Sequence, residues 1–368
     1  MRILYFSRDY CPHDHRILSA IVAGGHEVYY LRLEDAGRNL ESRPIPEGVQ
    51  VVQWRGGMKK FHWYNIPTLV LSLKEVIIDV RPDLIHAGPI QSVGLVSVLS
   101  GFHPLVSMSW GFDLMQDAGK NIFSSWVTRN VLSRSDWLFG DCQAVLNKAE
   151  EFGFNLKRSS YFPWGVDLQH FNAGDGSRLR KQLGWTDNTI LFCNRSWELQ
   201  YGVDIVAEAF VKASQVNDNL RLLLLGSGSQ KEKIERILND GNVLNKVVFA
   251  GQVPNSELPD YYRAADLYIS ASHTDGSSVS LMEALACGLP AAISDIPSNL
   301  EWVSPGEEGW LFTDGSVEQL SALMQKLDQE KVNLAVMQIK ARRKAEKFAD
   351  WNSNQRKMLK GYDMAVKK

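Results

Sequence analysis

The sequence predicts an α/β protein with two doubly wound parallel sheets. Short apolar segments of strand length alternate with amphipathic segments of helix length, and this alternation is typical of parallel sheets covered by helices. The pattern runs through the first half of the chain and starts again near residue 188. Because domains of about 150 residues are common, a chain of 368 residues is expected to hold two of them.

The first half carries the first set of strands and helices. A helical pattern over 15–23 ends at Gly24 and Gly25, since glycine favours the end of a helix. Residues 12–16 are expected in the loop that leads from the first strand into this helix. The strands predicted in this half are 2–6, 27–31, 82–86 and 105–109.

The second half repeats this organisation. A helix is predicted over 203–214 and a final helix over 353–366, while 163–185, with several glycines and charges, is expected to link the two halves. The strands predicted in this half are 188–193, 222–225, 247–249, 267–270 and 291–294.

The composition is that of an ordinary globular protein. The chain has 40 Lys and Arg residues against 42 Asp and Glu, a net charge of −2, and 45% hydrophobic residues. This balance argues against a disordered chain and against a protein that binds nucleic acid. The cysteines lie far apart without C-x-x-C spacing, so neither a disulfide framework nor a zinc site is expected and a reducing compartment fits best. These cysteines are Cys11, Cys142, Cys193 and Cys287.

The two ends of the chain bear on its location. The N-terminus lacks the apolar run and cleavage site of a signal peptide, and no apolar run of about 18 residues is present, so a cytoplasmic protein is expected. Residues 330–368 hold 11 basic and 4 acidic residues. This excess is either a solvated helical face or a site of peripheral contact with the inner face of an anionic membrane.

The segment 275–290 carries the clearest chemical signal. A Gly-Ser-Ser turn enters an amphipathic helix that ends at Gly288 and Pro290. The free backbone N–H groups at the start of such a helix favour a phosphate. Asp275 and Glu283 flank this helix start, so both are expected to reach a ligand there and to accept hydrogen bonds from sugar hydroxyls.

This segment resembles the E-x7-E motif of the retaining glycosyltransferases of family 4 (group 1), which have the GT-B fold. Other stretches resemble elements of the same family, and their order and spacing agree with it. These stretches are 24–28, 163–167, 225–228, 248–253 and 262–267.

The resemblance covers nearly the whole chain and implies the GT-B architecture, in which two Rossmann-like domains face each other across a cleft. The N-terminal domain, 1–167, would bind the acceptor, and the C-terminal domain, 168–349, would bind the nucleotide-sugar donor. The last helix, 350–368, would cross back to the first domain.

The resemblance assigns the chemistry to Arg195, Asp275 and Glu283. Arg195 would hold the diphosphate, Asp275 would lie near the sugar ring, and Glu283 would bind the ribose. Fixed donors at the diphosphate stabilise the negative charge that develops as the bond between sugar and phosphate breaks. The other donor-binding residues that the resemblance implies are Tyr201, Gly226, Val253, Gly276, Ser277, Ser278 and Val279.

The chain departs from the family pattern at several positions. Asp275 stands where the family has a glutamate, Tyr201 where it has a lysine, and Trp110 where it has a histidine. Residues 12–16 replace the usual Gly-Gly loop after the first strand. Replacement of a lysine by tyrosine removes a positive charge from the diphosphate site but keeps one hydrogen-bond donor.

Several polar residues of the first half are candidates for acceptor or cleft contacts. Asp113 is explained equally by a helix cap, whereas for His86 a place in the core is favoured over contact with a ligand. A metal site at His13 and His15 is the less favoured explanation of these histidines. The acceptor or cleft candidates are His13, Asp14, Arg16, Trp110 and Asp113.

Two alternatives concern the second half. Asp275 has the alternative role of a helix N-cap, since aspartate is favoured there. Asn299 and Glu301 follow a strand and are further candidates for contact with the donor, against a purely structural role.

The function that follows is transfer of a sugar, with retention, from a nucleotide-diphosphate sugar to a glycan, lipid-linked or small-molecule acceptor. A UDP-sugar is favoured, with a GDP-sugar as the second choice. No cofactor is expected, and no metal, because an arginine and a helix N-terminus replace the cation and no D-x-D sequence is present. The alternatives are a sugar-nucleotide epimerase of the same fold and a degenerate subunit that binds nucleotide sugar without turning it over.

Overall fold

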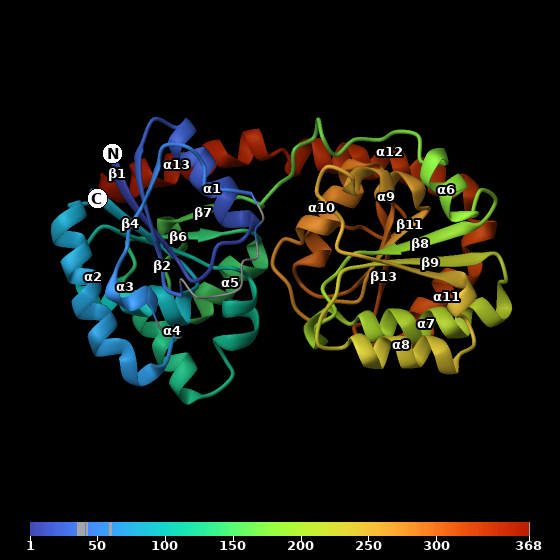
Figure 1. The fold of residues 1–368 in the computed structure, drawn as a ribbon, viewed down its shortest axis with the longest axis horizontal. Helices are drawn as coiled ribbons and strands as arrows, with labels where there is room; N and C mark the ends of the chain where they lie inside the picture. The colour runs from blue at the N-terminus through green and yellow to red at the C-terminus, as the bar shows by residue number, and fades with distance from the viewer. Residues whose placement is uncertain (35–40, 42, 59–60, 368) are drawn as a thin grey trace. The chain divides into compact units, whose positions relative to one another are not determined.

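The computed structural model describes residues 1–34, 41, 43–58 and 61–367. The chain forms two compact units (Figure 1). Unit 1 comprises Met1–Pro163 and Asn352–Lys368, and unit 2 comprises Trp164–Trp351. The unit boundaries fall a few residues from the expected positions at 167 and 349.

Unit 1 contains a seven-stranded sheet in the order β3-β2-β1-β4-β5-β6-β7. All neighbouring strands run parallel, so their carboxyl ends lie at one edge. The strands are β1 (Arg2–Ser7), β2 (Glu27–Arg32), β3 (Val49–Val51), β4 (Leu84–Ala87), β5 (Leu105–Met108), β6 (Trp137–Gly140) and β7 (Ser159–Tyr161).

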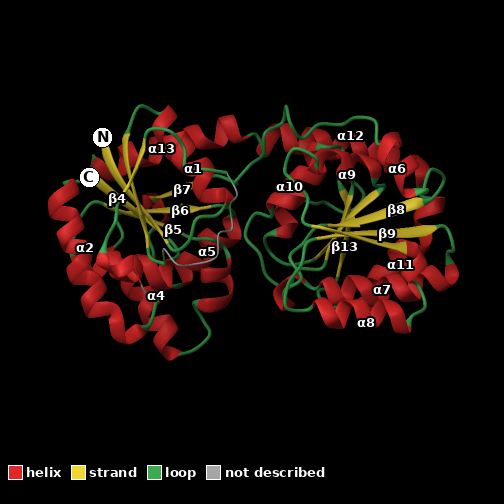
Figure 2. Ribbon diagram, in the orientation of Figure 1, coloured by secondary structure: helices red, strands yellow, loops and turns green. Residues whose placement is uncertain are grey.

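Helices cover both faces of this sheet (Figure 2). Leu4, Phe6 and Ile85 point from the strands toward one face, where their core cluster includes residues of α2 to α5. The helices of unit 1 are α1 (Pro12–Ala23), α2 (Ile66–Val80), α3 (Leu95–Ser100), α4 (Ile122–Arg134), α5 (Gln143–Glu151) and α13 (Trp351–Val366). Shorter helical turns are η1 (Arg55–Met58), η2 (Trp63–Asn65), η3 (Ile90–Gly94), η4 (Asp113–Asp117) and η5 (Leu156–Arg158).

The last helix, α13, packs on the opposite face of the same sheet. His86 on β4 is fully buried, and its Nδ1 lies 2.7 Å from the Tyr362 hydroxyl on α13. Tyr5 and Phe139 place their rings 4.9 and 5.2 Å from the His86 ring. His86 is therefore a core histidine that joins the sheet to α13, and burial lowers its pKa to about 3.

Unit 2 contains a six-stranded parallel sheet in the order β10-β9-β8-β11-β12-β13. The strands are β8 (Thr189–Cys193), β9 (Leu220–Leu225), β10 (Val247–Gly251), β11 (Leu267–Ser270), β12 (Ala291–Ser294) and β13 (Gly309–Phe312). The helices are α6 (Ser177–Leu183), α7 (Val203–Val216), α8 (Lys231–Asp240), α9 (Leu258–Ala264), α10 (Val279–Ala286), α11 (Val317–Lys326) and α12 (Lys331–Phe348). Shorter turns are η6 (Leu199–Tyr201), η7 (Leu244–Lys246), η8 (Asn299–Glu301) and η9 (Leu327–Gln329).

The prediction of two doubly wound parallel sheets is confirmed, but two local predictions were wrong. Residues 12–14 form the first turn of α1 and not a loop, because Pro12 suits the first helical position and Asp14 accepts the Cys11 N–H at 2.8 Å. The expected linker 163–185 contains the helix α6.

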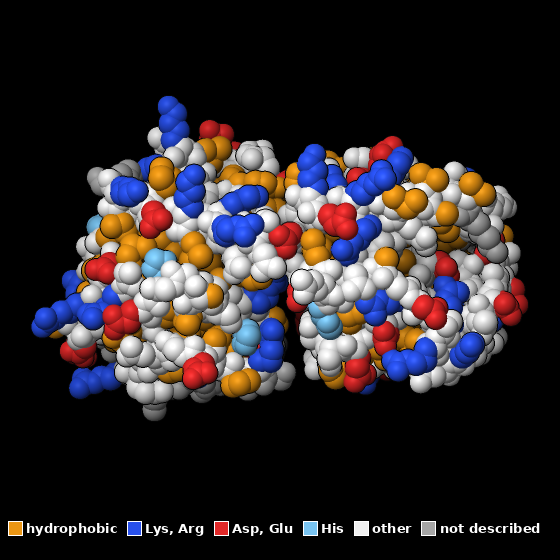
Figure 3. All heavy atoms as spheres, turned by 90° about the horizontal axis from the view of Figure 1, so that it is seen from above, with side chains coloured by type: hydrophobic (Ala, Val, Ile, Leu, Met, Phe, Trp, Pro, Cys, Tyr) orange, Lys and Arg blue, Asp and Glu red, His pale blue; other side chains and the backbone are white. Residues whose placement is uncertain are grey.

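The surface shows no charge segregation on the face seen in Figure 3, where Lys and Arg side chains are interspersed with Asp and Glu. Over the described ranges, no helix combines the length and the apolar character needed to cross a bilayer.

Candidate functional site

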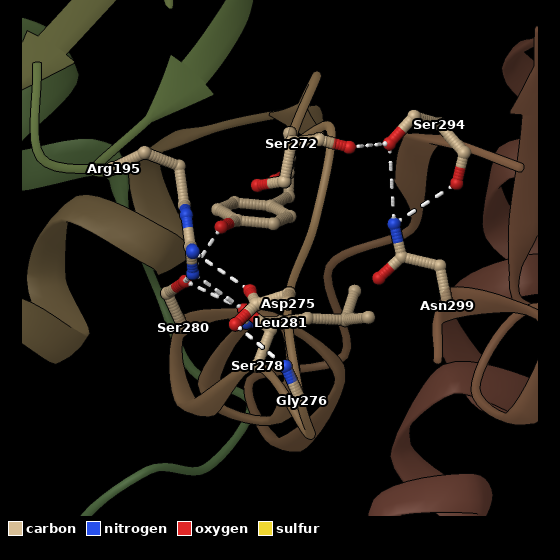
Figure 4. Close-up of polar contacts among 11 residues, drawn as sticks. Arg195, Ser272, Asp275, Gly276, Ser278, Ser280, Leu281, Ser294 and Asn299 are labelled. Atoms are coloured by element: carbon tan, nitrogen blue, oxygen red, sulfur yellow. Dashed lines mark hydrogen bonds and ion pairs between the residues drawn. The ribbon is translucent and has the colours of Figure 1, made fainter. Parts of the chain in front are cut away.

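The candidate site lies in unit 2, at the edge where parallel strands end. Arg195 follows β8 and Asp275 follows β11, and these two strands are parallel neighbours. Ligands of such sheets bind at the carboxyl ends of the strands. The sheet therefore brings two predicted site residues together although they are far apart in the sequence (Figure 4).

Arg195 is held by three side chains. Its Nη2 donates to Oδ2 of Asp275 at 2.7 Å, while Nη1 donates to Oγ of Ser278 at 2.7 Å and to Oγ of Ser280 at 3.0 Å (Figure 4). The residue is only 8% exposed. Such a buried guanidinium, fixed by several acceptors, is oriented before any ligand arrives.

The charges of this pair influence each other. Burial raises the pKa of Asp275, whereas the Arg195 charge acts in the opposite direction. Burial also acts to lower the pKa of Arg195, but the Asp275 carboxylate raises it above its ordinary value. Arg195 therefore keeps its positive charge, and the opposite charges of Arg195 and Asp275 strengthen the hydrogen bond between them.

Tyr201 covers the face of the guanidinium. The Cζ atom of Arg195 lies 4.1 Å from the centroid of the Tyr201 ring. Tyr201 ends η6, and the next residue, Gly202, has a φ of 59° and lies so close to β11 that a Cβ there would be 2.1 Å from the Ala271 carbonyl oxygen. This close approach requires glycine, and it fixes where the Tyr201 ring lies.

The helix α10 begins at Val279, and its N-cap is Ser278. The Ser278 hydroxyl accepts the Leu281 N–H at 3.4 Å, so Asp275 is not the N-cap that the sequence offered as an alternative. Gly276 donates its N–H to Oδ1 of Asp275 at 3.0 Å, and Ser277 accepts from Nε1 of Trp302 at 3.3 Å. The predicted anion-binding turn is thus next to Arg195, with Val279 in the first helical position.

Glu283 is buried within α10 and meets Tyr262. The Tyr262 hydroxyl lies 2.7 Å from Oε2 of Glu283 and accepts from Nδ2 of Asn194 at 2.7 Å. Burial, and then the Glu283 charge, raise the pKa of Tyr262 well above its ordinary value, so it remains a donor. Neither Tyr262 nor Asn194 was predicted as a site residue, although Tyr262 opens the 262–267 stretch and Asn194 precedes Arg195.

The structure places the other second-half candidates as follows. Gly226 has a φ of 98°, and a Cβ there would lie 2.8 Å from the Arg195 carbonyl oxygen, so this glycine allows β9 and β8 to end close together. Val253 is partly exposed after β10. Asn299 is buried and donates from Nδ2 to the Ser294 carbonyl oxygen at 2.9 Å (Figure 4), and Glu301 ends η8.

Among the first-half candidates, Asp113 is the acceptor that holds the surrounding loops in place. Its buried carboxylate accepts from the Ile90 N–H at 2.9 Å, the Ser109 hydroxyl at 2.5 Å, and the Trp110 and Leu114 N–H groups at 3.0 Å. Burial raises its pKa to about 6. The N-cap of η4 is Phe112, so Asp113 is not the N-cap of that turn, and its contact with an acceptor or sugar stays a prediction.

Asp14 also points into unit 1. It accepts from the Tyr5 hydroxyl at 2.7 Å, and burial raises its pKa to about 6. His13 and Trp110 are brought together, with ring centroids 5.6 Å apart. Burial and the charge of Arg16, which is half-buried, lower the pKa of His13 to about 3. Across the described residues, no three His, Cys, Asp or Glu side chains are grouped to hold a metal ion.

Two Rossmann-like parallel sheets in one chain define the class: this is the two-domain GT-B fold. Sucrose-phosphate synthase from Thermosynechococcus elongatus has a TM-score of 0.84 at 16% identity, covering 99% of this chain and 98% of that one. Anabaena HepE, solved in complex with UDP-glucose, has a TM-score of 0.82 at 17% identity, covering 99% of this chain and 100% of that one.

The chain belongs to the group 1 glycosyltransferases, of the family 4-like type. The family model "Glycosyl transferases group 1" matches residues 176–345, and the model "Glycosyl transferase 4-like" matches residues 2–140. The first match includes Arg195, Asp275 and Glu283.

Curated relatives agree with this assignment. A D-inositol 3-phosphate glycosyltransferase of Acidothermus cellulolyticus is 30% identical over 51% of this chain and 45% of its own length. A glycogen synthase of Mycobacterium tuberculosis is 25% identical over 88% of this chain and 84% of its own length. For the first and for a Rhodococcus opacus relative of the same name, the match spans about half of the relative (45% and 55%).

Proposed function

We propose that this protein transfers a sugar from a nucleotide-diphosphate sugar to an acceptor, with retention of the anomeric configuration. The observation that carries the proposal is the buried Arg195 beside Asp275, at the turn that opens α10. The family membership and the names of the relatives support it.

In this proposal Arg195 and the start of α10 bind the diphosphate. Bond cleavage between sugar and phosphate places negative charge on the leaving diphosphate and positive character on the sugar ring. A fixed guanidinium and oriented backbone N–H groups stabilise that charge more in the transition state than in the ground state. We assign no metal to this step, because these groups supply the positive charge.

Glu283 is proposed to bind the ribose of the donor. Its carboxylate accepts hydrogen bonds, and Tyr262 fixes one oxygen at 2.7 Å. A carboxylate has about four acceptor positions, so Glu283 can also accept from a ribose hydroxyl. Asp275 is proposed to contact the transferred sugar. Gly226 and Val253, which follow neighbouring strands, complete the donor site.

Retention is proposed to require no strong protein nucleophile. The leaving group and the acceptor hydroxyl would share one face of the sugar, and the departing phosphate oxygen would take the acceptor proton. The donor is proposed to be a UDP-sugar, since HepE was solved with UDP and with UDP-glucose. A GDP-sugar is the second choice, since one relative is named a GDP-mannose-dependent mannosyltransferase.

The acceptor is proposed to be a glycan, a lipid-linked sugar or a small molecule that binds unit 1. His13, Arg16 and Trp110, on α1 and after β5, are the side chains we assign to it. The epimerase and the non-catalytic subunit are not favoured, because the relatives carry transferase and synthase names.

The test is a panel of UDP-, GDP- and ADP-sugars, scored by thermal shift and then by slow release of the free nucleoside diphosphate. We expect a UDP-sugar to raise the melting temperature and to be hydrolysed slowly. With an acceptor, NMR of the product should show the anomeric configuration of the donor. Binding of no donor contradicts the function, and binding without any release of diphosphate supports the non-catalytic subunit.

A weak contact with anionic membranes is proposed as an additional property. The exposed face of α12 carries the apolar side chains Val332, Val336 and Ile339, followed by Arg343 and Lys347. Apolar and basic side chains on one helical face favour the interface of an anionic bilayer. Sedimentation with anionic and neutral vesicles tests this, and equal recovery in the supernatant contradicts it.

A further inference from the structure

The guanidinium of Arg195 has an edge with two parallel N–H donors, of which one is used. Nε–H and one Nη2–H form a fork that two oxygens of a carboxylate or phosphate fill together. Nη2 donates to Oδ2 of Asp275 at 2.7 Å, whereas the buried Nε has no hydrogen-bond partner among the described residues. The fork is therefore half filled.

Asp275 leaves the second position open because its other oxygen is used elsewhere. Oδ1 accepts the N–H of Gly276, the next residue, at 3.0 Å. An aspartate side chain is short, which favours such a bond to the neighbouring backbone. Asp275 therefore contacts Arg195 through one oxygen only.

Other groups besides Asp275 also hold the guanidinium. Ser278 and Ser280 accept from Nη1 at 2.7 and 3.0 Å, and the Tyr201 ring covers the face at 4.1 Å. These contacts keep the fork in place when the partner of Nη2 changes. A buried N–H without a partner is unfavourable, so an oxyanion that accepts from both Nε and Nη2 has an advantage over Asp275.

We propose that Asp275 occupies the place of the ligand's diphosphate in the empty site, and that a diphosphate displaces it from Arg195. The freed carboxylate is then available to accept a hydrogen bond from the transferred sugar. After transfer, the same carboxylate competes with the product diphosphate for Arg195 and promotes its release. The inference rests on the proposed function only for the identity of the ligand.

The exchange is tested by replacing the carboxylate with a neutral side chain of the same shape. Binding of inorganic pyrophosphate and of UDP is measured by calorimetry on wild type and Asp275→Asn. Because two negative groups no longer share one arginine, we expect the variant to bind pyrophosphate roughly 10- to 100-fold more tightly. The same substitution should slow turnover of a nucleotide sugar.

Asp314→Asn is the matched control. Asp314 lies in the same unit and pairs with His273 at 2.6 Å, so this variant removes one negative charge without changing the contacts of Arg195. Its affinity for pyrophosphate should equal that of wild type. If Asp275→Asn does not fold, Asp275→Ser removes the same charge and keeps an acceptor for the Gly276 N–H.

Each outcome decides between the alternatives. Affinity for pyrophosphate in Asp275→Asn that equals or falls below that of wild type overturns the exchange, because the carboxylate then organises Arg195 and does not compete. Pyrophosphate binding by neither protein overturns it as well. Tighter pyrophosphate binding without binding of any nucleotide sugar supports the exchange but contradicts the proposed function.

Discussion

The Cζ atom of Arg195 lies over the Tyr201 ring, 4.1 Å from the ring centroid. A lysine at this position would add a second positive charge, whereas the tyrosine orients the one that is present. An aromatic face beside a buried cation stabilises it and limits its motion.

The first prediction concerns this ring. Tyr201→Leu should weaken pyrophosphate and UDP binding by about 1–2 kcal/mol, the range of a desolvated cation–π contact, while Tyr201→Phe should bind both as wild type does. Calorimetry measures the difference. If the phenylalanine variant is as weak as the leucine variant, the hydroxyl and not the ring carries the effect.

The second prediction separates the nucleoside from the phosphates. Glu283→Gln should weaken UDP binding roughly 10- to 100-fold, since a hydrogen bond to a charged group is lost, and should leave pyrophosphate binding unchanged. Glu235→Gln, an exposed position on α8, is the control. An equal loss for UDP and pyrophosphate would mean that Glu283 supports the anion site and does not contact the ribose.

The third prediction concerns Asp113, whose carboxylate serves four donors. Asp113→Ala leaves these groups buried without an acceptor, and each such group costs about 1–3 kcal/mol. Because several such groups are affected, we expect the free energy of unfolding of unit 1 to fall by on the order of 3 kcal/mol or more. Urea unfolding measures it, with the exposed Asp79→Asn as the control.

Binding of UDP by Asp113→Ala provides a second measurement for this prediction. Because Asp113 belongs to unit 1, UDP affinity under folding conditions should not change in Asp113→Ala. A variant that unfolds like wild type but fails to use an acceptor would instead support a direct contact between Asp113 and the acceptor.

The fourth prediction is that the stability of the protein depends on pH through the protonation of His86. Its pKa is about 3 in the folded chain and about 6.5 when unfolded. Unfolding therefore takes up a proton between these values, and the stability that neutral His86 provides is complete above about pH 6.5 and is lost as the pH falls toward 3.

The measurement compares wild type with His86→Gln, which does not titrate. Wild type should lose more unfolding free energy than the variant between pH 7 and pH 4, by about 1.4 kcal/mol for each pH unit over which the protonation differs. Asp14 and Asp113 act in the opposite direction, because their pKa values are raised to about 6 in the folded chain. Both proteins share that effect, so the difference isolates His86, and identical pH profiles would contradict its role.

The bounds of two strands of unit 2 could be predicted because local signals mark their ends. β11 and β12 have the predicted bounds, since Asp266 precedes the first strand and Pro290 the second. The helix α12 was missed because its apolar side chains are split between two sides: Leu334 and Met337 are buried, while Val336 and Ile339 are exposed. No single apolar stripe appears in such a sequence.

The sequence singles out residues for the candidate site, and their roles stay predictions, whereas their contacts could not be predicted. Arg195, Asp275 and Glu283 follow from the pattern of strands, turn and helix and from the family resemblance. The direct pairing of Arg195 with Asp275 depends on the register of β8 against β11, which no local pattern encodes. The same holds for Tyr262 beside Glu283, which depends on the packing of α9 against α10.

The bond between His86 and Tyr362 has a consequence for the order in which the chain folds. On the ribosome, unit 2 is complete in sequence once Trp351 has been made, whereas unit 1 awaits α13 to close one face of its sheet. Domains form as units during synthesis. The half of the chain that is translated first is therefore the half that finishes folding last.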